Sequence, residues 1–252
     1  MVQVEHQGVR STVWLNYAPL NLLTYERIQE IIKAHQAADC EPSTRVIVTR
    51  SRLPQIFSHG LDPEYLLKKN EVERAAAFQG ISDLLYHMMG LKKPLIAAVE
   101  GDTFAGGAVL AATADFRLFH QEHGKLSFAE AKVGLAMPRA MIQMLSSFVS
   151  PGALREVVMM GKNFDAPAAL QAGIANGVYG GPQFEKALDD WCTKLARLHP
   201  LVHEVNKGHI NKKARNMARK LCRSDKAYRP FMGAGLLEEG LKSVVEKRPP
   251  KF

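Results

Sequence analysis

Short apolar runs rich in β-forming residues alternate with amphipathic helical segments along the first two thirds of the chain, and this alternation constrains the fold most. Residues 10–15 and 45–49 are two such runs, and between them Thr24 can cap an amphipathic helix. The runs at residues 95–99 and 116–119 continue the series. Residues 95–99 are continuously apolar, as expected of a strand buried on both faces. Strands that alternate with helices predict an α/β fold with βαβ units.

The last third of the chain carries mainly helical signals. Residues 184–198 repeat apolar side chains with helical periodicity, until His199-Pro200 interrupts the pattern. The turn of glycine and proline at residues 180–182 is the best candidate for a boundary. We therefore expect an α/β core at residues 1–180 and a helical C-terminal region at residues 181–252, together forming one domain with a helical appendage.

The composition is that of a globular protein, because 46% of the 252 residues are hydrophobic and 23% are charged. The best apolar run, residues 94–99, stops at Glu100 and is far shorter than the roughly 18 residues of a membrane-spanning helix. Cys40, Cys192 and Cys222 are scattered and lack metal-ligand spacing. We expect no disulfide framework, no metal site and a reducing compartment.

The net charge of +8 is concentrated in one segment. Residues 207–229 contain nine Lys or Arg and one acidic residue, Asp225. Their net charge of +8 equals that of the whole chain. A basic segment of this kind can meet the phosphates of a cofactor, a nucleic acid or an anionic membrane. A solvated helix face explains it equally well.

Two turns that contain glycine each follow a β-rich run. The first spans residues 56–62 and ends at Asp62-Pro63, an N-cap and first-turn proline that open a helix. The second spans residues 93–107, where Ala105-Gly106-Gly107 lead into a helix of small residues. Glycines let a ligand approach the backbone, and the free amides at a helix start attract negative charge. Neither a dinucleotide fingerprint nor a P-loop is present, which argues against nicotinamide cofactors and nucleoside triphosphates.

Four motifs in this order resemble the crotonase (enoyl-CoA hydratase/isomerase) superfamily over about residues 10–180. They are FSHGLD at 57–62, KPLIAAVEG at 93–101, AGG at 105–107, and the stretch from Ala129-Glu130 to Gly134-Leu135. The resemblance implies a crotonase-like spiral of ββα turns with a helical C-terminal part that supports a homotrimer. It also implies an acyl-CoA substrate, whose thioester oxygen two backbone N–H groups hold as an enolate. No cofactor is implied beyond the coenzyme A of the substrate.

Carried onto this chain, the family's oxyanion donors are the amides of Leu61 and Gly106. Family hydratases use two glutamates, and here Val109 stands at the first place and Glu130 at the second. Loss of one carboxylate argues against hydration, whereas one base suffices to move a proton. The pattern resembles Δ3,Δ2-enoyl-CoA isomerases, in which a single glutamate takes a proton from C2 of a 3-enoyl-CoA and returns it at C4.

Residues 123–138 resemble the plant-type peroxisomal isomerases in particular, which implies a role in fatty-acid β-oxidation. The C-terminal Pro250-Lys251-Phe252 shares only its lysine with the peroxisomal address Ser-Lys-Leu, and the first residues lack the composition of a secretory signal or a transit peptide. We expect a peroxisomal or cytoplasmic protein, and import into mitochondria with later removal of a presequence stays open.

The resemblance also places substrate-binding positions in an early Pro-Leu-Asn motif and in both turns. They are Ala18, Leu20, His59, Gly60, Gly107 and Val109. For the coenzyme A phosphates, Lys68 and Lys69 compete with the basic segment that contains Lys207, Lys212 and Lys213. The helix expected from Asp62 to about Leu91 borders either the fatty-acyl tunnel or the core.

Several alternatives remain open at this point. Spacing alone favours an ordinary glutamate at position 130, exposed or paired for example with Lys125 or Lys132, and only the resemblance favours a catalytic one. His120 and His123 flank an expected hairpin and are interpreted as solvated. The scaffold could also serve a hydratase or a thioester hydrolase. A non-catalytic protein that binds nucleic acid or a membrane through residues 207–229 ranks last, because no aromatic-interleaved RNA motif is evident.

Overall fold

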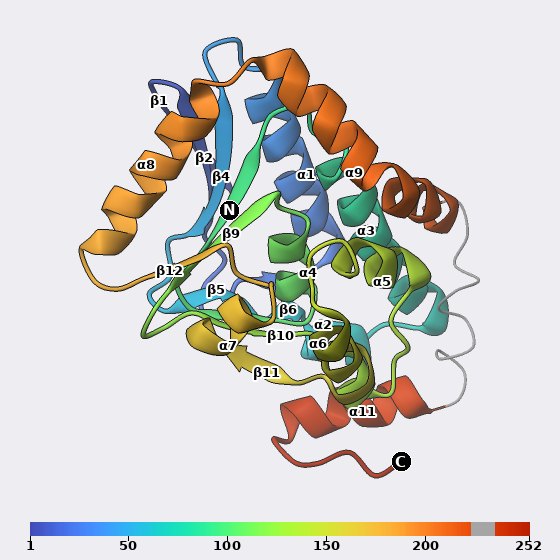
Figure 1. Cartoon of the computed structure of the whole chain (residues 1–252). Helices are drawn as coiled ribbons and strands as arrows, with labels where there is room; N and C mark the ends of the chain where they lie inside the picture. Colours follow the sequence, from blue (N-terminus) through green and yellow to red (C-terminus); the bar gives the residue numbers. More distant parts are fainter. Residues whose placement is uncertain (223–234) are drawn as a thin grey trace.

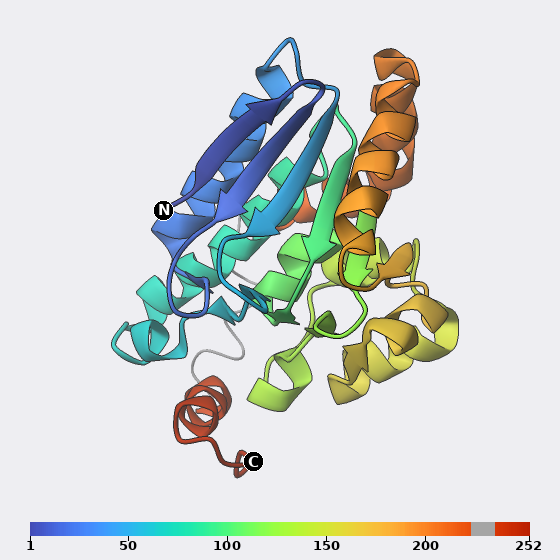
Figure 2. The ribbon, with the colours of Figure 1, turned by 90° about the vertical axis from the view of Figure 1, so that its left-hand side faces the viewer.

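A six-stranded sheet forms the centre of the computed structural model, which describes residues 1–222 and 235–252 (Figures 1 and 2). The strand order is β1-β2-β4-β7-β9-β12. The strands are β1 Gln3–Gln7, β2 Arg10–Leu15, β4 Val46–Ser51, β7 Leu95–Val99, β9 Phe116–His120 and β12 Gly177–Tyr179. β1 is antiparallel to β2, and every other neighbouring pair is parallel, as the predicted βαβ units require.

A second, smaller layer of short strands lies beside the central sheet. Its four-stranded sheet has the order β11-β10-β8-β5, and a third sheet pairs β3 with β6. The strands are β3 Leu22–Leu23, β5 Ile56–Ser58, β6 Gly60–Leu61, β8 Asp102–Phe104, β10 Lys125–Ser127 and β11 Asn163–Asp165. Strand β8 was not predicted, because its three residues directly follow the turn at Gly101 and are too few for a periodic signal.

The hairpin expected between His120 and His123 is wrong. β9 pairs with β7 and β12, whereas β10 pairs with β8 and β11, so the two strands belong to different sheets. The two histidine rings stack at the crossing, with their centroids 4.7 Å apart, and both residues are partly buried rather than fully solvated.

Helices surround both layers. They are α1 Tyr25–Cys40, α2 Pro63–Leu67, α3 Glu71–Met88, α4 Gly106–Ala112, the 3₁₀ helix η1 Glu130–Val133, α5 Arg139–Leu145, α6 Pro151–Arg155, the π-helix η2 Glu156–Met160, α7 Ala166–Gln171, α8 Gln183–Ala196, α9 Pro200–Leu221 and α11 Leu236–Val245. The predicted caps are confirmed at Thr24 and Asp62, whose side chains accept from backbone N–H groups in the first helical turn. The single helix expected up to about Leu91 is instead two, because Asn70 and Glu73 form a capping box that starts α3.

The central sheet has a separate apolar core on each face, as β7 illustrates. Leu95, Ala97 and Val99 point into the larger core shared with α1, α3 and α4. Ile96 and Ala98 point to the other face, where α8 covers the sheet with Phe184, Leu188, Cys192 and Leu195. Figure 1 shows α8 on one side of the sheet and α1, α3 and α9 on the other. The helices after residue 181 therefore complete the main cores.

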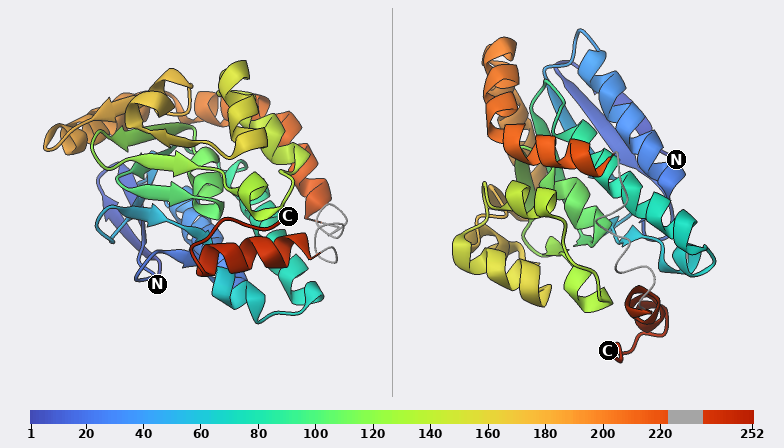
Figure 3. Two further views of the ribbon diagram at one scale, coloured as in Figure 1. Left: turned by 90° about the horizontal axis from the view of Figure 1, so that it is seen from below. Right: turned by 90° about the vertical axis from the view of Figure 1, so that its right-hand side faces the viewer.

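The last helix, α11, lies below the sheet layers against α2 and η1 (Figure 3). A third apolar cluster joins them, with Leu66, Phe78, Leu135, Leu237 and Leu241 among its members. In the part of the chain that the structure describes, no helix has the length and apolar character needed to cross a membrane. Within the same residues, no group of three or more His, Cys, Asp or Glu side chains is arranged to hold a metal ion.

Candidate active site

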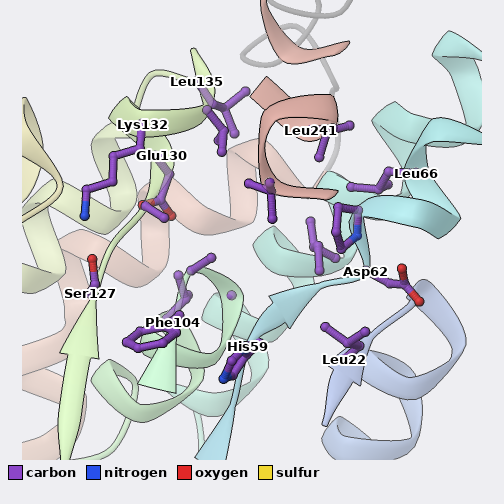
Figure 4. Close-up of a pocket in the computed structure, with 18 of the residues that line it drawn as sticks. Leu22, His59, Asp62, Leu66, Phe104, Ser127, Glu130, Lys132, Leu135 and Leu241 are labelled. Carbon is purple, nitrogen blue, oxygen red and sulfur yellow. The ribbon is translucent and has the colours of Figure 1, made fainter. Parts of the chain in front are cut away.

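A cavity of about 900 Å³ opens between the two glycine turns, η1 and α11 (Figure 4). Leu61 of β6, Gly106 and Val109 of α4, and Glu130 of η1 all line it. Its wall is mostly apolar, and α2, α3 and α11 supply Leu66, Phe78, Ile81, Leu237 and Leu241. A large apolar cavity with a few converging polar groups is the usual form of a small-molecule site.

The two glycine turns meet backbone to backbone at the cavity floor. A Cβ atom on Gly60 would lie 2.5 Å from the amide nitrogen of Gly106 and 2.9 Å from the carbonyl oxygen of Phe104. Gly60 also has a φ of +81°, which disfavours any residue with a side chain. Only glycine at this position therefore lets β6 approach the start of α4 so closely.

The amide of Gly106 is free at the start of α4. The first hydrogen bond of this helix runs from the Val109 N–H to the carbonyl of Ala105, so the amide of Gly106 has no acceptor within the helix. Ala105, just before it, adopts a φ of +48° and a ψ of −121°. A residue with a side chain in this region costs about 1–3 kcal/mol, and such strain occurs mostly at functional sites.

The amide of Leu61 points away from the neighbouring strand. Leu61 pairs with Leu23 in the parallel ladder of β3 and β6, and the next amide, that of Asp62, donates to the carbonyl of Leu23 at 3.0 Å. Consecutive N–H groups of a strand point to opposite edges, so the Leu61 N–H is directed to the other side. The two predicted donors, Leu61 and Gly106, thus belong to backbone segments in contact with each other.

Glu130 is the first residue of η1, and its side chain enters the cavity (Figure 4). Its Oε2 atom is buried and has no hydrogen-bond partner among the described residues. Burial raises the pKa of this carboxyl to about 7, against a smaller opposing effect of its own backbone N–H. The predicted alternative of an ion pair is not found among these residues, since Lys132 donates to Asn163 at 2.9 Å and Lys125 lies 3.9 Å from Asp102.

Val109 is fully buried in α4 and lines the same cavity. Besides Glu130, two acidic residues line the cavity among the described residues, and neither resembles it. Asp62 caps α2 by accepting from the Tyr65 N–H at 3.0 Å, and Glu64 is exposed. Glu130 is therefore the one carboxyl of the three with a buried, unpaired oxygen.

Of the other predicted substrate positions, Leu20 and His59 line the cavity, whereas Ala18 and Gly107 do not. The His59 ring is tilted against Phe104 at 5.0 Å between centroids. Burial lowers the pKa of His59, although Asp102 at 3.7 Å opposes this shift. Ala18 is exposed beside the cavity lining at Pro19. Gly107 instead packs against β5, since a Cβ there would lie 2.2 Å from the carbonyl oxygen of Ser58.

Lys207, one of the open candidates for the phosphate contact, is engaged within the fold. Its ammonium group donates to Asp115 at 2.7 Å and to the Lys93 carbonyl at 3.0 Å, and only 6% of its side chain is exposed. Lys69 pairs with Glu73 at 2.9 Å, whereas Lys68, Lys212 and Lys213 are exposed. Positions 223–229 of the basic segment lie outside the described residues.

The contribution of α11 to the cavity was not predicted. Leu237, Leu241, Val244 and Val245 line it from a helix more than 100 residues beyond Glu130. The spacing of these four residues is that of an amphipathic helix, so the helix itself could have been found. The packing of α11 against η1, which begins at Glu130, is a contact between segments far apart in the sequence, so no local pattern encodes it.

Known proteins give the same picture of the fold. A family model described as enoyl-CoA hydratase/isomerase matches residues 7–252, well beyond the predicted limit near residue 180. An enoyl-CoA isomerase/hydratase of Mycosarcoma maydis is 24% identical over 92% of this chain and 88% of its own length. A Mycobacterium leprae protein named "probable enoyl-CoA hydratase" is 30% identical over 92% of this chain and 90% of its own.

Among solved structures, human mitochondrial Δ3-Δ2-enoyl-CoA isomerase superposes with a TM-score of 0.91 at 20% identity. The superposition covers 98% of this chain and 97% of the human one, which establishes the predicted crotonase fold. At this identity, the likeness speaks for the fold and leaves the reaction open. From its matched family model and its fold, this chain belongs to the enoyl-CoA hydratase/isomerase family of acyl-CoA enzymes.

Proposed function

We propose that this protein is a Δ3,Δ2-enoyl-CoA isomerase that uses Glu130 as its single acid–base group. The observation that carries the proposal is the carboxyl oxygen of Glu130, which is buried and unpaired among the described residues. The cavity is also lined by Val109, which stands where the resemblance expects a second carboxylate. The contact between the turns of Gly60 and Gly106 supports the second half of the machinery, a pair of backbone donors.

In the proposed reaction, the thioester oxygen accepts hydrogen bonds from the amides of Leu61 and Gly106. The carboxylate of Glu130 removes a proton from C2, and the electrons of the broken C–H bond form a dienolate that the two amides stabilise. The protonated Glu130 then delivers the same proton to C4. A new C–H bond forms there, the double bond now joins C2 and C3, and Glu130 is again a carboxylate.

The electrostatics of Glu130 suit a group that must act first as base and then as acid. General acid–base catalysis is most effective when the pKa of the group lies near the working pH. Burial raises the pKa of Glu130 to about 7, so both protonation states are accessible near neutrality. The apolar side chain of Val109 offers no hydrogen bond to a water molecule, which disfavours hydration of the product.

The remaining lining supports the same class of substrate. Leu20 and His59, which the resemblance expects beside coenzyme A, both line the cavity. Leu66, Phe78 and Leu241 give the cavity an apolar lining that suits a fatty-acyl chain, and Figure 4 shows Leu66 and Leu241 across the cavity from Glu130. The homotrimer and the peroxisomal or cytoplasmic location stay predictions from the resemblance.

The test is to give purified protein a 3-enoyl-CoA and to follow the absorbance of the conjugated 2-enoyl thioester. We expect conversion by the wild type and a loss of at least about 10²-fold in kcat for Glu130→Gln, because general base catalysis contributes about 10²- to 10⁴-fold. Glu64→Gln is the matched control, since Glu64 is an exposed carboxylate at the same cavity. A folded Glu130→Gln variant with wild-type activity would overturn the assignment.

Hydration is the second candidate, favoured by the name of the Mycobacterium leprae relative. It differs in its product, because water would be added to a 2-enoyl-CoA to give a 3-hydroxyacyl-CoA. Chromatography of the products from both substrates separates the two reactions. Rapid formation of 3-hydroxyacyl-CoA without isomerisation would favour hydration and contradict the proposal.

A further inference from the structure

Helix α11 rests directly on the backbone of η1, the turn that carries Glu130. Gly240 lies in the middle of α11, and a Cβ atom on it would lie 2.3 Å from the carbonyl oxygen of Val133 and 2.6 Å from its Cα atom. Non-bonded carbon atoms prefer about 3.5–4.0 Å, so any side chain at this position requires a shift of about 1 Å between the two backbones. Glycine thus sets the distance between α11 and η1.

Helix α11 also packs against α2 and α3. Leu237 and Leu241 are buried in the cluster with Leu66. Glu238 lies 3.7 Å from the guanidinium of Arg74, which itself donates to the Leu66 carbonyl at 2.9 Å. Because these contacts oppose movement of α11, a larger residue at Gly240 would push on η1 as well as on α11.

The turn of η1 transmits such a push to Glu130. The carbonyl oxygen of Glu130 accepts from the N–H groups of Gly134 and Leu135, the latter at 2.9 Å. Gly134 is also closely packed, because a Cβ atom on it would lie 2.9 Å from the ring of Phe252 and 3.1 Å from the carbonyl oxygen of Leu236. These hydrogen bonds tie both ends of the turn together, so Val133 and Glu130 move as one unit.

Three charged residues near η1 have partners other than Glu130. Lys132, on the turn itself, donates to Asn163. On α11, Glu239 pairs with Arg248. In the segment after η2, Lys162 pairs with Glu156 at 2.8 Å. His59 and Asp62 from the turn before α2, Glu64 on α2 and Lys247 after α11 line the same cavity, but burial is the largest cause of the raised pKa of Glu130. A gap between α11 and η1 that admitted water would therefore lower this pKa.

We propose that Gly240 is a positioning residue, which seats α11 on η1 and thereby keeps the Glu130 carboxyl dry and directed into the cavity. The expected effect on kcat rests on the proposed function. The expected effect on the burial and pKa of Glu130 does not. α11 contributes in this way to the chemistry as well as to the wall of the cavity.

Gly240→Ala tests the proposal, because alanine is the better helix former and the change does not weaken α11 by itself. We expect kcat to fall by about 10- to 100-fold, since a misplacement of about 1 Å can cost 10²-fold. Admission of water should also lower the pKa of Glu130 from about 7 toward its ordinary value of 4.5. Carbon NMR of ¹³C-labelled glutamate, assigned with Glu130→Gln, measures this pKa without any substrate.

Lys242→Ala is the control on the same helix, since Lys242 is exposed and pairs only with Glu238 among the described residues. It should leave both the titration of Glu130 and kcat unchanged. If Gly240→Ala does not fold, Leu237→Ala loosens α11 without overlap and should shift the titration in the same direction. Should the folded variant keep the wild-type titration and kcat, the proposal is wrong. A shifted titration in a protein without isomerase activity would support the seating role and refute only the proposed function.

Discussion

The contact between Gly60 and Gly106 makes a quantitative prediction about the proposed oxyanion donors. Gly60→Ala places a methyl group 2.5 Å from the Gly106 nitrogen, about 1 Å closer than a normal contact. The φ of +81° adds about 1–2 kcal/mol for a residue with a Cβ atom. If the two turns separate, one donor loses its alignment, and kcat should fall about 10²- to 10³-fold, or roughly 2.7–4 kcal/mol.

Gly8→Ala isolates the effect of the close approach from that of the backbone conformation. Gly8 has a φ of +57°, so alanine there carries a similar backbone cost, but no atom lies within 4 Å of its Cβ position. Both variants should unfold at a lower temperature than the wild type. Only Gly60→Ala should have a lower kcat in the absorbance assay. The same comparison can be made on hydration, because a backbone oxyanion site would serve either reaction.

Two results would refute this reasoning. A folded Gly60→Ala variant with wild-type kcat would mean that the spacing of the two turns is not catalytic. An equal loss of kcat in Gly8→Ala would mean that activity follows general stability instead. Assays well below the unfolding temperature of each variant keep the two causes apart.

Two further predictions concern pH and the basic segment. The carboxylate form of Glu130 must take the first proton, and burial raises its pKa to about 7. We therefore expect kcat/KM to rise as the pH increases to about 7 and to level off above it. A profile that is flat from pH 5 to 8 would argue against Glu130 as the base. Lys207→Met leaves Asp115 without the partner it has at 2.7 Å, so it should lower the free energy of unfolding by about 3 kcal/mol in urea titration, yet leave the KM for acyl-CoA unchanged. An increased KM at unchanged stability would restore Lys207 as a phosphate ligand.

The sequence was most informative where one local rule acts alone. The buried strand at Leu95–Val99 and the helix start at Asp62 were predicted at their observed positions, since continuous apolarity and capping depend on neighbouring residues. The break before α3 had a readable signal as well, the pair of Asn70 and Glu73, but the apolar periodicity across it favoured one helix.

Features determined by distant contacts could not be read in this way. Lys207 looks like any other lysine of a basic helix, and only the fold brings it to Asp115, 92 residues earlier. The assignment of Glu130 depended on resemblance, because spacing alone does not distinguish a buried carboxyl from a surface ion pair. Glu130 begins η1, and η1 contacts α11, which the chain reaches more than 100 residues later.

The environment of Glu130 also explains why such a site must be supported by the rest of the fold. A carboxyl whose pKa is raised from 4.5 to about 7 in the folded state binds its proton more tightly there than in the unfolded chain. Stability therefore decreases as the pH rises from 4.5 to 7, by on the order of 3 kcal/mol in total, and the full cost applies above pH 7. A shuttle with one carboxyl requires this cost, because a fully hydrated glutamate would be a weak base at neutrality. In the proposed mechanism, the apolar cluster around α11 has two effects. Its burial stabilises the fold against this loss, and it also keeps water away from Glu130.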